Sequence, residues 1–213
     1  MLKEGQIRIP SGCAIAAIID KKGNPINGSE IIKSIALMHD RSNGLGGGFA
    51  AYGIYPEHAD DYAFHVFYDS NDARAHCEEY LFKHFNVDVA ERIPTKKIES
   101  IENGPDIWRY FGKPNRVRMQ NARMDELEYV VQCVTKVNDQ FDGSYIFSSG
   151  KNMGCFKAVG YPEDVGEFYM LDQYDAYLWT AHGRFPTNTP GWWGGSVQHS
   201  RLVNRSQRRN FVL

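Results

Sequence analysis

Residues 13–20 read CAIAAIID, an unbroken apolar run that ends in an aspartate and is followed by the turn sequence KKGNP. A short apolar run bounded by turn-forming residues is typical of a buried β-strand. The run begins at Cys13, so a thiol is predicted at the start of a strand inside the fold.

Working outward from this strand, the chain alternates between helix-like and strand-like patterns. Helices are expected from Ser29, as the N-cap residue, to His39 and over residues 71–85 and 124–141. Strands are expected at residues 48–55 and 62–69, which we pair with each other, at residues 176–182, and in a hairpin over residues 143–160 that turns at Lys151 and Asn152. Residues 92–123 contain several prolines and are expected to be an insertion or an excursion at the sheet edge. These elements favour a layered α+β fold over a regular βαβ array.

The charges of the chain nearly cancel. Lys and Arg number 24 against 26 Asp and Glu, a formal net charge of −2, which argues against a dedicated binder of nucleic acid or membrane surfaces. No apolar stretch reaches the roughly 18 residues of a transmembrane helix, and residues 1–10 lack the apolar centre of a secretory signal. We therefore expect a cytoplasmic protein with no nucleic-acid or membrane partner.

Four cysteines are spread through the chain, and they form no CxxC pair and no cluster with histidines. This spacing predicts neither a zinc site nor a disulfide framework. Cys77, Cys133 and Cys155 are interpreted as inert core thiols. Cys13 differs from them because of a second segment far along the sequence.

That segment, residues 180–195, reads TAHGRFPTNTPGWWGG. A strand that ends in an arginine and continues into Thr, Asn and Thr between prolines is too polar to be simple core, and it predicts the wall of a binding site. The glycine-rich residues 43–48, NGLGGG, lack both the GK[ST] ending and the GxGxxG spacing of phosphate-binding loops.

Together these segments resemble a known family. RFPTNTPGWWGG at 184–195 resembles the RFSTNT-type segment of glutamate synthases, and the Cys13 strand with MHDRSNGLGGG at 38–48 resembles the start of class II glutamine amidotransferases. The closest likeness is to the stand-alone amidotransferase subunit of an archaeal-type glutamate synthase, over residues 13–195. The resemblance implies the four-layer αββα sandwich of N-terminal-nucleophile hydrolases, truncated at its C-terminal side.

The resemblance also implies roles for individual residues. Cys13 would be the catalytic nucleophile and its own α-amino group the base, which requires removal of residues 1–12 as a leader. Arg184 would hold the α-carboxylate of glutamine through a planar, bidentate guanidinium. Other substrate-binding positions are Thr187, Asn188, Arg41 and Ser42, the last standing where the family usually has glycine. No metal or organic cofactor is implied for this half-reaction.

The implied activity is hydrolysis of glutamine to glutamate and ammonia, with the ammonia delivered to a glutamate synthase subunit. Two alternatives stay open. The chain could be a non-catalytic glutamine-binding or scaffold subunit, or it could be an amidotransferase that serves another acceptor.

Residues 196–213, SVQHSRLVNRSQRRNFVL, do not continue the resemblance. When they are back-translated with suitable synonymous codons and shifted by one base, they read PFSILDWSIVHNGEISS, which resembles the family's continuation and its oxyanion-hole Asn-Gly pair. We therefore expect residues 196–213 to be an out-of-frame tail, which would leave the chain an inactive fragment. The alternative is a genuine basic tail that binds RNA or a protein.

Overall fold

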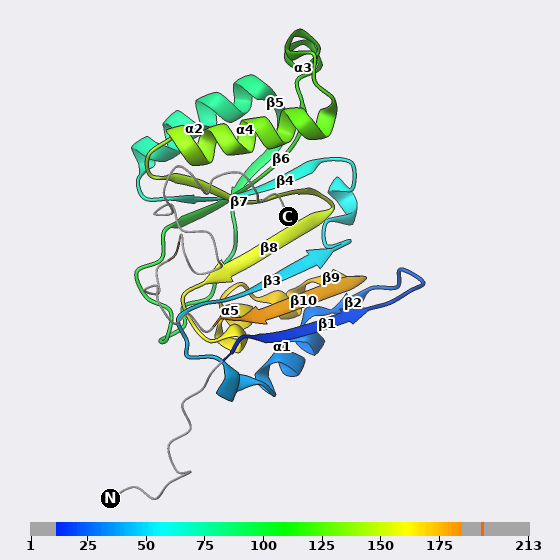
Figure 1. Ribbon diagram of the computed structural model, residues 1–213, viewed down its shortest axis with the longest axis vertical. Helices are drawn as coiled ribbons and strands as arrows, with labels where there is room; N and C mark the ends of the chain where they lie inside the picture. The colour runs from blue at the N-terminus through cyan, green and yellow to red at the C-terminus, as the bar shows by residue number, and fades with distance from the viewer. Residues whose placement is uncertain (1–11, 185–192, 194–213) are drawn as a thin grey trace, which may run out of the picture.

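A computed structural model describes residues 12–184 and residue 193 of the chain. Its strands are β1 (Ala14–Ile19), β2 (Ile26–Asn27), β3 (Gly47–Tyr52), β4 (Tyr62–Tyr68), β5 (Phe85–Arg92), β6 (Asp106–Pro114), β7 (Ser144–Lys151), β8 (Met153–Ala158), β9 (Asp175–Ala176) and β10 (Leu178–Gly183). Its helices are α1 (Gly28–Ala36), α2 (Asn71–His84), α3 (Arg116–Ala122), α4 (Glu126–Gln140) and α5 (Pro162–Phe168), with 3₁₀ turns η1 (His39–Arg41), η2 (Pro56–His58) and η3 (Leu171–Gln173). The fold is mixed α+β with antiparallel sheets, as expected (Figure 1). Within the described ranges, no helix is long and apolar enough to span a bilayer.

The first sheet has the strand order β1-β10-β3-β8, with every neighbouring pair antiparallel. Helices α1 and α5 pack against one of its faces. A Cβ added to Gly166 of α5 would lie 3.2 Å from Phe49 Cζ, and one added to Gly28 of α1 would lie 3.1 Å from Trp179 Cη2. Phe49 and Trp179 are buried there, so this face carries the core of the first sheet.

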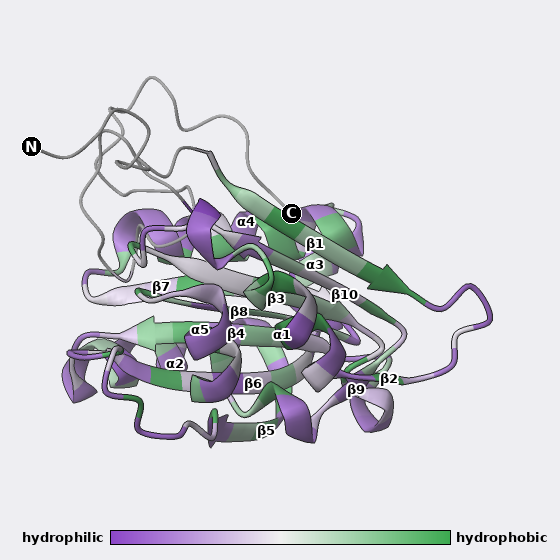
Figure 2. Ribbon diagram, turned by 90° about the horizontal axis from the view of Figure 1, so that it is seen from below, coloured by the Kyte–Doolittle hydropathy of each residue, from purple (hydrophilic) through white to green (hydrophobic). Residues whose placement is uncertain are grey.

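The opposite face of the first sheet is exposed along the edge strand β1, whereas Met153 and Lys157 of β8 on the same face are buried. Ile15 and Ile19 of the edge strand β1 are 70% and 57% exposed. Figure 2 shows β1 as a hydrophobic ribbon along the edge of the described fold. A strand that is apolar on both faces is usually buried on both, so this face has the composition of a packing surface.

The second sheet has the strand order β5-β6-β4-β7, also antiparallel. Its elements follow one another as β4-α2-β5-β6-α4-β7, with α3 as a short addition between β6 and α4. Both α2 and α4 cover the same face, where Cys77 and Leu81 of α2 and Val130 and Val137 of α4 join one apolar cluster with Phe64 of β4. This element order and strand order are those of the ferredoxin-like unit. We call residues 62–151 the βαββαβ unit.

The βαββαβ unit is inserted into the first sheet between β3 and β8. Asn152 is the single residue between β7 and β8, and it has φ 47°. Its carbonyl accepts from Gly53 N (2.7 Å) and its side-chain oxygen accepts from Tyr55 N (2.7 Å). The point where the chain leaves the βαββαβ unit is therefore fastened to the point where it enters.

This arrangement corrects three predictions. Strands 48–55 and 62–69 do not pair, because β3 pairs with β10 and β8 whereas β4 pairs with β6 and β7. The turn at Lys151 and Asn152 is where it was predicted, but the two strands that it joins belong to different sheets. Residues 92–123 are not an edge excursion, because they contain β6, which lies between β5 and β4. In the first two cases the sequence pattern identified the strands but not their partners. In the third case the prolines concealed β6.

A buried polar contact joins the βαββαβ unit to the first sheet. His65 of β4 is fully buried, and its Nδ1 lies 2.7 Å from the carbonyl oxygen of Cys155 on β8. Because a carbonyl only accepts, Nδ1 carries the proton, and Nε2 accepts from the Tyr55 hydroxyl at 2.9 Å. Burial lowers the pKa of His65 to about 3, so the ring is neutral in the fold.

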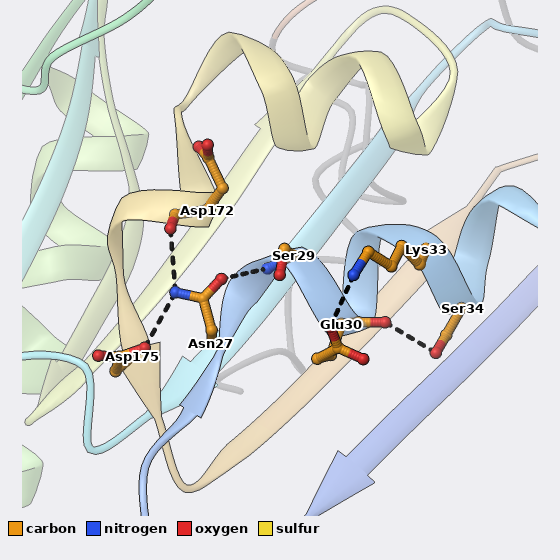
Figure 3. A network of polar contacts seen from close by, with 7 residues as sticks. All are labelled: Asn27, Ser29, Glu30, Lys33, Ser34, Asp172 and Asp175. Carbon is orange, nitrogen blue, oxygen red and sulfur yellow. Dashed lines mark hydrogen bonds and ion pairs between the residues drawn. The ribbon is translucent and has the colours of Figure 1, made fainter.

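Helix α1 begins two residues earlier than predicted, because its N-cap is Asn27 rather than Ser29. The Asn27 side-chain oxygen accepts from Ser29 N (3.1 Å), while its amide donates to the carbonyl of Asp172 (2.9 Å) and to the carboxylate of Asp175 (3.0 Å) (Figure 3). Gly28 is required at the first position, because a Cβ there would lie 2.1 Å from Leu171 O. The cap thus fixes α1 against η3 and β9.

Candidate functional site

One end of the first sheet carries the candidate nucleophile and the candidate carboxylate-binding arginine. Ala14 at the start of β1 is paired with Gly183 at the end of β10. Cys13 directly precedes this pair and Arg184 directly follows it, so the two residues lie side by side at neighbouring strand ends. Arg184 N donates to Gly46 O (2.9 Å), which extends the site to the start of β3.

Extending the strand alternation by one residue puts these side chains on the face opposite helices α1 and α5. Cys13 shares its side of β1 with the exposed Ile15, and Arg184 shares its side of β10 with His182. The intervening Ala14 and Gly183 face the helices, where a Cβ on Gly183 would lie 2.9 Å from Pro162 Cγ. The thiol and the guanidinium therefore belong to the face that the described helices leave uncovered.

The electrostatics of this pair suit a site for an anionic group. Arg184 is 7% exposed, and burial lowers its pKa from the usual value, an effect opposed by the neighbouring Cys13 thiol. Arginine stays protonated in proteins, so Arg184 is a fixed positive charge beside an exposed thiol. Burial, and then the charge of Arg184, lower the pKa of His182, which keeps its ring neutral at pH 7.

The turn η1 contributes the two remaining described candidates. Ser42, which follows η1, is buried, and its hydroxyl donates to Arg184 O (3.4 Å) and accepts from Gly44 N (3.4 Å). Arg41 is exposed, and its guanidinium Nη2 lies 3.2 Å from where a Cβ on Gly12 would stand. Gly12 is in the left-handed region at φ 101° and immediately precedes Cys13.

The structure thus brings Cys13, Arg41, Ser42 and Arg184 together at one end of one sheet. Thr187 and Asn188, the two other predicted substrate contacts, lie outside the described residues. The hydroxyl of Ser42, at a position where the resemblance would put glycine, here bonds the backbone of Arg184.

The remaining thiols behave differently from Cys13. Cys77 and Cys133 are buried, as predicted, and Cys155 is half-buried. Burial raises the pKa of all three thiols, that of Cys77 to about 11. Over residues 12–184 and 193, no group of three or more His, Cys, Asp or Glu side chains is arranged to hold a metal ion.

Sequence reasoning missed the residues that hold η1 in place. His39 Nδ1 contacts Glu163 Oε1 at the start of α5, and the His39 ring stacks on Tyr161 with centroids 4.1 Å apart and planes 22° apart. His39 and Glu163 are 124 residues apart in sequence. His39 lies in the segment 38–48 quoted above, but Glu163 belongs to no motif, so no local signal could have paired them.

Comparison with known proteins gives one relative and no family. No family model matches the chain. The chain is 46% identical over 187 residues to a protein of Archaeoglobus fulgidus that is described as uncharacterized, a match that covers 86% of this chain and 49% of the relative. The chain spans about half the length of this relative.

Proposed function

We propose that this chain carries the nucleophile and substrate-carboxylate site of a class II glutamine amidotransferase. The observation that carries the proposal is the placement of Cys13 and Arg184 side by side at paired strand ends, with Arg41 beside the residue that precedes Cys13. An exposed thiol next to a buried, fixed guanidinium at the end of the first sheet suits an amino-acid amide that has its own carboxylate.

The proposed reaction uses the two residues in different roles. Arg184 binds the α-carboxylate of glutamine and sets the distance of the side-chain amide from Cys13. The thiol attacks the amide carbon, its proton goes to the departing nitrogen, and ammonia leaves a thioester that water hydrolyses to glutamate. The base would be the α-amino group of Cys13, released when residues 1–12 are removed.

The four-layer αββα sandwich is part of this proposal. Helices α1 and α5 with the first sheet supply one helical layer and one sheet layer, and the exposed face of β1 with Ile15 and Ile19 suits a second sheet. The βαββαβ unit does not supply that layer, because its own helices cover one of its faces and its other face packs into the core shared with α5.

A glutamine-binding role without hydrolysis is the second candidate. In this chain Gly12 precedes Cys13, so the Cys13 nitrogen belongs to a peptide bond and cannot act as the base. The unprocessed chain would then bind glutamine through Arg184 without turning it over. A synthase subunit that takes the ammonia, or a different acceptor enzyme, would be the partner of the processed form.

Intact mass measurement combined with a glutaminase assay tests the proposal. We expect a mature mass that begins at Cys13, release of ammonia from glutamine, and loss of that activity in Cys13→Ala but not in the matched thiol control Cys155→Ala. A glutamine-analogue electrophile should label Cys13 in the active form. If glutamine neither turns over nor slows modification of Cys13 in either form of the chain, both candidate functions are wrong.

A further inference from the structure

The turn η1, which carries Arg41, contacts Tyr161 and Glu163 at the start of α5. His39 opens η1, stacks on the ring of Tyr161 and contacts the carboxylate of Glu163. The turn is closed internally, because Arg41 N donates to Met38 O and Ser42 N donates to His39 O, both at 2.9 Å. A displacement of His39 would therefore move Arg41 and Ser42 with it.

The approach between the two segments is close along its whole length. A Cβ on Gly44 would lie 3.0 Å from Tyr161 Cε2, and one on Gly47 would lie 2.9 Å from Pro162 Cα. Gly44 also has φ +73°, a conformation that favours glycine. The backbone after η1 thus lies directly on Tyr161 and Pro162, which leaves little room for η1 to shift.

The same helix also contacts the βαββαβ unit. Ser100 Oγ donates to Asp164 Oδ2 (2.7 Å), Lys96 Nζ contacts Glu167 Oε1 (2.5 Å), and Lys96 N donates to Phe168 O (2.7 Å). Ser100 and Lys96 follow β5 in the loop that leads to β6. Helix α5 therefore connects the inserted unit to the turn that carries Arg41.

We propose that Tyr161 and Glu163 are positioning residues, which act through His39 to hold the Arg41 guanidinium beside Gly12, the residue that precedes Cys13. The role that this assigns to Arg41 rests on the proposed function, whereas the contacts themselves do not. A guanidinium at the residue before a thiol changes the charge that an approaching reagent meets there. Holding η1 therefore sets how readily Cys13 reacts.

The rate of Cys13 alkylation by the anionic reagent iodoacetate, measured on the full chain by peptide mass mapping, tests this proposal. We expect Arg41→Ala, Glu163→Gln and Tyr161→Ala each to slow alkylation about threefold, the size expected for an exposed ionic contact. Tyr161→Phe keeps the ring and should react at the wild-type rate. Glu167→Gln is the matched control, because it removes an ionic contact of the same helix that does not reach η1.

A double-mutant comparison separates positioning from general loosening. In the Arg41→Ala background, Glu163→Gln should slow alkylation no further. Additional slowing there, an unchanged rate in Glu163→Gln alone, or an unchanged rate in Arg41→Ala would each overturn the proposal. Far-UV circular dichroism checks folding, and if Tyr161→Ala unfolds, Glu163→Gln and Tyr161→Phe still decide the question. Glutamine is absent from this assay, so its result is independent of whether the chain binds glutamine.

Discussion

The two four-stranded sheets differ in how completely they are packed. Every residue of β4, at the centre of the second sheet, is buried, with helices on one face and the shared core on the other. In the first sheet, β1 is equally apolar, but Ile15 and Ile19 are mostly exposed among the described residues. Both sheets contribute buried residues to the core, but the candidate site lies on the sheet whose edge strand is exposed.

Substitutions at one buried position of the second sheet and one exposed position of the first test the difference in packing most strongly. Phe64→Ala removes a buried ring whose centroid lies 4.7 Å from that of Phe85. We expect the free energy of unfolding to fall by about 3–5 kcal/mol. Ile15→Ala should change it by less than about 0.5 kcal/mol, because the side chain is already exposed. Urea denaturation measures both. Equal losses would mean that something covers the β1 face in solution and would end the comparison.

The junction between the two sheets should make stability depend on pH. The folded pKa of His65, about 3, lies below the usual value of 6.5, so the unfolded chain binds the extra proton between these values. Stability should therefore fall as pH decreases from about 6.5 toward 3, by up to about 1.4 kcal/mol for each pH unit.

Unfolding measurements at several pH values in this window check that slope. His65→Gln should be less stable than wild type but should lose this part of the slope, whereas the exposed His76→Gln should keep it. An unchanged slope in His65→Gln would mean that other groups govern the acid sensitivity of the junction.

A smaller effect is expected at the helix that covers the closed face of the first sheet. Asn27→Ala removes the cap of α1 and its contacts with Asp172 and Asp175, which should cost about 1 kcal/mol. Thermal unfolding followed by circular dichroism measures the loss. Ser29→Ala is the comparison, because the sequence alone favoured Ser29 as the cap, and a larger loss there than in Asn27→Ala would contradict the structure.

The elements themselves could be predicted from sequence better than their partners could. Apolar runs and helical periods identified β1, α2 and α4 to within a few residues, because these patterns arise from burial of one or both faces. The same patterns carry no information about which strand lies beside which, so the insertion of the βαββαβ unit was not foreseen. Strand β6 was also missed, because prolines flank it closely.

Only those residues of the candidate site that lie in a recognisable sequence motif could be predicted. Cys13 and Arg184 came from their segments, but their adjacency depends on the register of β1 against β10, which the sequence does not encode locally. Tyr161 and Glu163 carry no motif and reach η1 only through the tertiary fold.

Because Asn152 is hydrogen-bonded to Gly53 and Tyr55, the whole inserted unit takes the place of a hairpin loop between β3 and β8. Tyr52 at the end of β3 and Met153 at the start of β8 already face each other as an antiparallel pair. Everything between them could in principle be replaced by a two-residue turn such as Asn-Gly, which suits a hairpin of this geometry. The first sheet, which carries the candidate site, would then keep the register between β3 and β8 that it has now.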